Sequence, residues 1–154
     1  MQLLKSCTLP QDCRITVVMG AEAPWLQQVR AQAQDMPWPT EVLVSISNIA
    51  QRMADSDLAI GAAGSTSWER CCLGLPTLIV VLADNQRAIA EVLQDAGAAK
   101  ILDNALAVPM RCEVLSSFVT NTKALYEMSI KAARIVDGLG AASVVSTFLT
   151  LENL

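Results

Sequence analysis

Histidine is absent from the 154-residue sequence, and none of its five cysteines forms a Cys-X-X-Cys pair. Zinc sites are built chiefly from these two residue types, so we expect no metal site in this chain. A nucleophilic cysteine normally needs a histidine to activate it, so catalysis of that kind is excluded as well. Because the number of cysteines is odd, we expect reduced, mostly buried thiols in a cytoplasmic protein without a bound cofactor.

Charge is also scarce in this sequence. Only 17% of the residues are charged, the net charge is −4, and no run of lysine or arginine occurs, which argues against a general nucleic-acid binder. No apolar run is long enough to cross a bilayer, and residues 1–5 are too short for the apolar core of a signal peptide. Hydrophobic residues make up 53% of the sequence, which is typical of an α/β domain with parallel strands covered on both faces. We expect a single domain over residues 1–154.

Short apolar runs alternate with helical segments as far as residue 102, which predicts a mostly parallel sheet flanked by helices. The expected strands are 14–19, 41–46, 57–60, 77–82 and 98–102. The expected helices are the end of one at 2–8, then 24–34, one capped by Ser47 or Asn48, one following Ser65–Ser67, one capped by Asp84 or Asn85, and a helical tail of 111–120, 122–136 and 140–150. The expected inward residues of the second and fifth helices are Trp25, Leu26, Val29, Ala88, Ile89, Val92, Leu93 and Ala96.

A glycine-rich loop follows the third expected strand, at residues 61–64. Three residues with hydroxyl groups come next, any of which could cap a helix, and Glu69 falls in the first turn of that helix. Gly74 ends the helix. Small residues at a strand tip let a ligand approach the backbone, and free N–H groups there attract phosphate. The alternative is a tight strand-to-helix turn without a ligand.

Polar and glycine-rich residues gather where the expected strands end. The strand ends lie at 20–22, 46–48, 61–65 and 83–86. Ligands of parallel α/β sheets bind beyond the carboxyl ends of the strands, so we expect the functional site at this edge.

The stretch 57–76 resembles the UDP-sugar hydrolases of pseudaminic acid biosynthesis, which are related to the spore-coat-polysaccharide type of protein. The match continues at 84–86 and 97–98, and then at 128–129, 136–138 and 140–141. More distantly, the chain is similar to the nucleotide-binding half of the N-acetylglucosaminyltransferase that makes lipid II. The resemblance covers nearly the whole chain.

The resemblance implies a two-domain GT-B fold. In that family the carboxyl-terminal, Rossmann-like half holds UDP, and the amino-terminal half supplies the catalytic groups, including a histidine. The hydrolase cleaves UDP from a 2,4-diacetamido-2,4,6-trideoxy sugar by attack of water. By this resemblance the chain is a Rossmann-like α/β domain with a helical carboxyl-terminal tail, which binds a UDP-sugar and has no catalytic residue of its own.

The resemblance also implies a role for each site residue. Glu69 would bind the ribose hydroxyls, because a carboxylate accepts two hydrogen bonds from a vicinal diol. Gly64, Ser65 and Thr66 would line the phosphates at the start of the helix. The alternative for these four is a capped helix with a favourable first-turn carboxylate. For Trp68, packing in the core is favoured over stacking on a base.

Three further residues complete the expected site. Ile46 would present its backbone to uracil, and Asn85 and Gln86 would face the sugar or the diphosphate from the start of the next helix. As an alternative, Asn85 and Gln86 are ordinary capping residues. Cys71 and Cys72 are expected in the core, on the helix face that packs against the sheet.

One strand is missing from the pattern. In a sheet of order 3-2-1-4-5-6 the strand before residues 2–8 would be central, and without it strands 14–19 and 57–60 have unpaired edges. Either these strands pair directly, or another segment or chain fills the gap, or the chain is a fragment of a longer protein. The functional alternatives are therefore the nucleotide-binding half of a hydrolase or of a glycosyltransferase, completed by an amino-terminal half, and a non-catalytic assembly partner or homo-oligomer.

Overall fold

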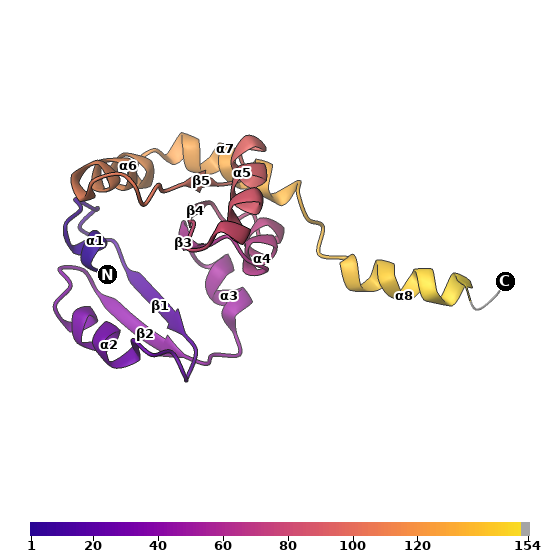
Figure 1. The fold of residues 1–154 in the computed structure, drawn as a ribbon, viewed down its shortest axis with the longest axis horizontal. Coiled ribbons are helices and arrows are strands. Elements are labelled where there is room, and N and C mark those ends of the chain that lie inside the picture. Colours follow the sequence, from indigo (N-terminus) through magenta and orange to yellow (C-terminus); the bar gives the residue numbers. More distant parts are fainter. Residues whose placement is uncertain (152–154) are drawn as a thin grey trace.

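Two parallel sheets form the centre of the fold (Figure 1). A computed structural model describes residues 1–151, and within that range the strands are β1 (Ile15–Met19), β2 (Thr40–Val44), β3 (Ala59–Ala62), β4 (Thr77–Val80) and β5 (Lys100–Ile101). β1 pairs with β2, and the second sheet has the order β3-β4-β5. Every pairing is parallel, which confirms the α/β class expected from the alternation of strands and helices.

Helices connect and flank the strands. They are α1 (Gln2–Lys5), α2 (Leu26–Gln34), α3 (Ile49–Ala54), α4 (Thr66–Cys72), α5 (Arg87–Asp95), α6 (Val108–Thr120), α7 (Thr122–Ala133) and α8 (Gly140–Leu151). Gly74 and Gly97 follow α4 and α5 with φ of +62° and +69°, the left-handed geometry that ends a helix, as the sequence predicted. Figure 1 shows that α8 projects away from the rest of the chain. Over residues 1–151, no helix combines the length and the hydropathy that a membrane crossing requires.

β1 and β3 do not pair, so direct pairing of these two strands is excluded among the alternatives left open by the sequence. The amide of Ile15 donates to the carbonyl of Pro39, and the carbonyl of Met19 accepts from Ser45, so these residues face β2. Residues between them, such as Val18, direct their backbone groups to the opposite edge. Val18 is 40% exposed and Ile60 of β3 is 44% exposed. Each sheet therefore ends in an apolar edge strand with one partner.

The buried core lies in the second half of the chain. Leu78 and Ile79 of β4 are fully buried, and α5, α6 and α7 supply Leu93, Leu115 and Ala132. Of the described residues before Ala63, only Cys7 is buried. The two-stranded sheet β1–β2 with α2 and α3 therefore contributes almost nothing to the fully buried core, and we call residues 8–55 the amino-terminal unit.

Some of the expected inward residues are exposed. Trp25 was expected to be inward, but it is 67% exposed, because it precedes α2 instead of lying on its packed face. Val92 was expected inward as well and is 60% exposed, because α5 turns Ala90 and Leu93 toward the core. Ala88 and Ala96 of the same expected face are also exposed, whereas Leu26, Val29 and Ile89 are partly buried.

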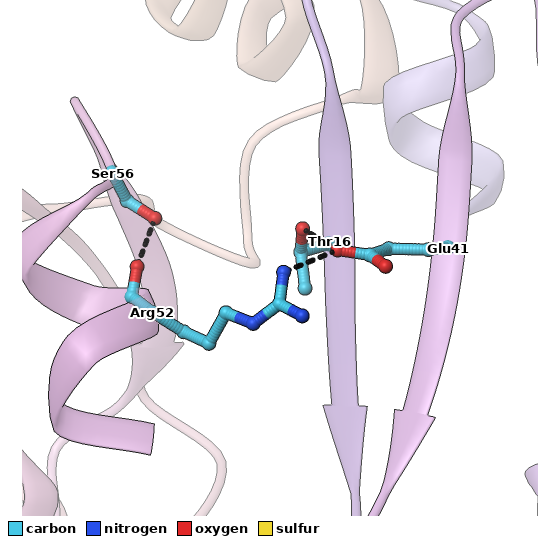
Figure 2. A network of polar contacts seen from close by, with 4 residues as sticks. All are labelled: Thr16, Glu41, Arg52 and Ser56. Atoms are coloured by element: carbon cyan, nitrogen blue, oxygen red, sulfur yellow. Dashed lines mark hydrogen bonds and ion pairs between the residues drawn. The ribbon is translucent and has the colours of Figure 1, made fainter. Parts of the chain in front are cut away.

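A polar network joins α3 to the sheet β1–β2 (Figure 2). The Glu41 carboxylate accepts from Arg52 Nη1 at 3.0 Å and from Thr16 Oγ1 at 2.9 Å. The Arg52 and Glu41 side chains are 41% and 46% exposed, so water screens their attraction and the ion pair contributes less than about 1 kcal/mol. The network orients α3 rather than stabilising the fold strongly.

Candidate functional site

The parallel strands bring the expected site residues together in two groups. Loops that follow neighbouring parallel strands lie side by side, so Ile46 after β2 lies beside the loop after β1. In the second sheet, the loop 63–65 after β3 and the segment 81–86 after β4 are neighbours in the same way. Among residues 1–151, no hydrogen bond or ion pair joins one group to the other.

The first group is organised by Ser45, which the sequence did not single out. Ser45 has a φ of +50°, a left-handed conformation that is uncommon for residues other than glycine. Its amide donates to the Met19 carbonyl at 2.9 Å, and its Oγ accepts from the Ala21 amide at 3.0 Å. These bonds hold the ends of β1 and β2 together and fix the position of Ile46, which is half-buried.

The glycine loop leaves its outer surface open at Gly64. A Cβ atom built on Gly64 would have no heavy atom within 4 Å, so a ligand could contact the backbone there. Ser65 is the residue before α4, but its side chain makes no capping bond, because its φ of −55° and ψ of −36° are already helical. Of the three hydroxyl residues that could cap this helix, Ser65 takes the N-cap position but makes no capping bond, so its exposed hydroxyl stays available.

The buried side chain of Arg70 holds this loop in place by hydrogen bonds. The sequence analysis did not identify this role of Arg70. Its side chain is 6% exposed, and Nη2 donates at 2.9 Å both to the Ala62 carbonyl and to Ser67 Oγ. Nη1 donates to Thr66 Oγ1 at 3.4 Å. A Cβ on Gly61 would lie 2.7 Å from Nη1, so any larger residue at that position would force the Arg70 guanidinium to shift.

Burial lowers the pKa of the Arg70 side chain, whereas the neighbouring Cys71 and Glu69 oppose that change. Arg70 thus ties the end of β3 to the first turn of α4. The residue gave no sequence signal because an arginine four residues beyond a helix start is usually a solvent-exposed side chain.

Glu69 lies in the first turn of α4, and its side chain is exposed. Within the described chain it makes no hydrogen bond or salt bridge, so its acceptor oxygens are available to a ligand. Trp68 beside it was expected to pack in the core, but it is 37% exposed, so that prediction is wrong. Ser67, Arg70 and Cys71 occupy the inward face of this short helix, which leaves no place there for an indole ring.

Cys71 is buried as expected, but Cys72 is exposed, because the seven residues of α4 present only one side to the sheet. Gln86 and Asn85 lie in the 3-10 turn Asp84–Gln86 that precedes α5. Neither Asp84 nor Asn85 makes a capping bond from its side chain, so that expectation is wrong. Instead, Gln86 Oε1 accepts from the Leu82 amide at 3.1 Å and shapes the loop after β4.

Around the second group, the exposed polar groups include the carboxylates of Glu69 and Asp84, the hydroxyls of Ser65 and Thr66, and the carboxamide of Asn85. The carboxylates can accept hydrogen bonds from ligand hydroxyls, and the hydroxyl and amide groups can donate to phosphate oxygens. In residues 1–151 no cluster of three potential metal-ligating residues is found. The arrangement is suited to holding a polar ligand rather than to acid–base chemistry.

Comparison with known families places almost the whole chain in one family. Residues 3–143 match the sequence model described as the glycosyltransferase family 28 C-terminal domain. The spore coat polysaccharide biosynthesis protein SpsG of Bacillus subtilis is 29% identical over 140 residues, which are 88% of this chain and 40% of that protein. A UDP-N-acetylglucosamine–N-acetylmuramyl-(pentapeptide) pyrophosphoryl-undecaprenol N-acetylglucosamine transferase of Phenylobacterium zucineum is 32% identical over 136 residues, 83% of this chain and 37% of that protein.

Solved structures agree with this placement. Acinetobacter baumannii MurG superposes with a TM-score of 0.81 at 25% identity, over 96% of this chain and 44% of MurG. The glycosyltransferase WaaG shares the fold with a TM-score of 0.69 at 20% identity, over 89% of this chain and 38% of WaaG. The α/β arrangement is thus that of the carboxyl-terminal domain of GT-B glycosyltransferases. The chain spans about 40% of the length of the curated relatives that it matches.

Proposed function

The chain belongs to the glycosyltransferase family 28 C-terminal domain family, and on that basis we propose that it binds a UDP-sugar as the nucleotide half of a GT-B enzyme. In this proposal residues 1–154 form a single cytoplasmic domain, with the catalytic groups on a separate half. The observation that supports it most is the exposed Glu69 carboxylate beside an open glycine backbone at Gly64.

The proposed roles follow the geometry of the second group. Glu69 binds the ribose hydroxyls, because an unpaired carboxylate can accept hydrogen bonds from both. Gly64, Ser65 and Thr66 line the diphosphate, and Asn85 and Gln86 face the diphosphate or the sugar. Ile46 offers its backbone to uracil from the first group. For Ile46 and Glu69 to bind one UDP molecule, the first and second groups must face the same ligand.

Transfer of the sugar is better supported than hydrolysis. The relatives at 32%, 33% and 35% identity carry the name of an N-acetylglucosamine transferase that uses UDP-N-acetylglucosamine. The hydrolase of pseudaminic acid biosynthesis remains the alternative, based on the motif at 57–76 and on the spore coat relative. Product analysis of the complete enzyme separates the two, because hydrolysis releases a free sugar and transfer yields a glycoside.

The partner of this domain is part of the proposal. The edge strands β1 and β3 each have one neighbour, and their apolar residues Val18 and Ile60 are exposed. An amino-terminal half, or a second copy of the chain, would cover these edges. Light scattering of the purified chain should then show a dimer if a second copy fills this role. A monomer that binds UDP would leave the amino-terminal half as the partner.

We expect calorimetry to detect UDP binding, and Glu69→Gln to weaken it by one to two orders of magnitude. A hydrogen bond to a charged group contributes about 1.5–3 kcal/mol, and glutamine offers one weaker acceptor in place of two. Glu91→Gln is the matched control, because Glu91 is also exposed but lies on α5. The Glu91→Gln variant should bind UDP with the affinity of the wild type. Absence of heat with millimolar UDP on folded protein, or equal affinity of both variants, would contradict the proposal.

A further inference from the structure

Two cysteines far apart in the sequence lie in contact near the end of α1. Cys7 follows α1 and Cys112 lies on α6, and their Sγ atoms are 2.7 Å apart, across 105 positions of sequence. Both thiols direct their hydrogen-bonding groups to the Leu3 carbonyl, at 3.0 Å from Cys7 Sγ and 3.5 Å from Cys112 Sγ. The Leu3 carbonyl, a single acceptor in α1, therefore lies within hydrogen-bond distance of both sulfurs.

The surroundings of this pair are apolar and well packed. Cys7 and Cys112 are 7% and 8% exposed and belong to the cluster with Leu78, Leu115 and Phe118. A disulfide bond is about 2.05 Å long, so the sulfurs need to approach by only about 0.7 Å. The helix α1 is only four residues long and has no fully buried residue, and its Leu3 and Leu4 pack against this cluster from the side of Cys7.

A cavity lies near this junction. It has a volume of about 560 Å³, and its lining includes Leu3, Ser6 and Arg111. Neither Cys7 nor Cys112 lines it, so a reagent in the cavity reaches the two sulfurs only when the α1 segment shifts.

We propose that Cys7 and Cys112 form an oxidation site, at which a small-molecule disulfide converts the two thiols into a disulfide that fastens the α1 segment to α6. The proposal is independent of nucleotide binding, because Cys7, Cys112 and the residues around them are not among the expected ligands of UDP.

The reaction is a thiol–disulfide exchange in two steps. One cysteine, as the thiolate, attacks a sulfur of the small disulfide, whose S–S bond breaks and releases the first small thiol. The second cysteine then attacks the mixed disulfide, forms the Cys7–Cys112 bond and releases the second small thiol. The two cysteines lose two electrons and two protons, and the small disulfide takes them up.

The rate of this reaction is set by how often a thiolate forms. Burial raises the pKa of Cys7 to about 12, with the hydrogen bond to Cys112 adding to the effect. Since the thiolate is the attacking species, oxidation should be slow at neutral pH and become faster as the pH rises toward that value.

The test is to treat the folded chain with oxidised glutathione at pH 8 and to count thiols by alkylation and intact mass. We expect Cys7 and Cys112 both to be lost to alkylation, with a mass loss of about 2 Da in the peptides that carry them and no glutathione on either residue; the exposed Cys72 and the half-exposed Cys13 are counted separately. Trypsin should then yield a linked pair of peptides, 6–14 and 112–123. The oxidised chain should also melt at a higher temperature than the reduced chain, because the bond closes a long loop.

Variants separate this pair from other thiols. Peptide 6–14 contains Cys13 as well as Cys7, so Cys13→Ser must keep the linkage and Cys7→Ser must lose it. Cys112→Ser and Cys112→Ala must also lose it, and circular dichroism checks that each variant is folded. Free thiols at both Cys7 and Cys112 after treatment, a lasting glutathione adduct on either of them, a linkage that needs Cys13, or a bond between two copies would each overturn the proposal.

Discussion

Replacing Arg70 with alanine should lower the free energy of unfolding by about 3 kcal/mol. The guanidinium makes hydrogen bonds to the Ala62 carbonyl, Ser67 Oγ and Thr66 Oγ1, and Ser67 is 2% exposed. Removing the guanidinium takes a donor from the buried Ser67 Oγ and from the half-buried Ala62 carbonyl, at about 1–3 kcal/mol each, whereas relief of the buried charge offsets part of that loss. Urea denaturation followed by circular dichroism measures the difference.

Two further variants make the Arg70 result specific. Arg87→Ala is the matched control, because Arg87 is exposed at the start of α5 and should change stability by less than about 0.5 kcal/mol. Arg70→Lys should fall between the wild type and Arg70→Ala, because an ammonium group cannot reach all three acceptors with the geometry of a planar guanidinium. If Arg70→Ala were as stable as Arg87→Ala, Arg70 would not support the glycine loop.

Leu78→Ala should destabilise the chain by about 3–4 kcal/mol. Leu78 lies on the central strand β4, is 0% exposed, and packs in the cluster that contains Leu115 and Phe118. Truncation of a buried leucine removes its transfer free energy and leaves a cavity, and the strands on either side of β4 limit how far the site can collapse. Urea denaturation of the variant gives the magnitude.

Leu82→Ala is the matched control for Leu78→Ala. Leu82 comes two residues after the end of β4 and is 71% exposed, so its truncation should change stability by less than about 0.5 kcal/mol. Equal losses in the two variants would mean that the second sheet is not the main core of the molecule.

The strands and their direction could be predicted because each is a short apolar run between turn residues. The run 77–82, for example, contains β4, and the glycines at 74 and 97 end their helices with the expected left-handed geometry. The positions of Glu69, Gly64 and Asn85 at strand or helix ends followed from the same pattern. The ends of β2 and β4 were overestimated by two residues, because apolar residues continue past the last ladder hydrogen bond. The end of β3 was underestimated by two residues, because Gly61 and Ala62 were expected in the glycine loop but lie in the strand.

Burial of individual side chains could not be predicted in the same way. Trp25 and Trp68 are large and apolar, but Trp25 precedes its helix and Trp68 lies on the outward side of a seven-residue helix. Ser45 and Arg70 were missed because their roles depend on tertiary contacts, with the loop after β1 for Ser45 and with Gly61 for Arg70. The local sequence pattern identifies helices and strands, whereas the contacts between them decide which side chains are buried.

The amino-terminal unit has a consequence for cooperativity. Because residues 8–55 contribute no fully buried side chain, this part of the described chain can melt while the second sheet and its helices remain folded. Trp25 and Trp38 lie in the amino-terminal unit, and Trp68 lies outside it, so intrinsic fluorescence sums two separate events. A single two-state fit to that signal would average them, and only a probe confined to the second sheet reports the stability that Leu78 and Arg70 determine.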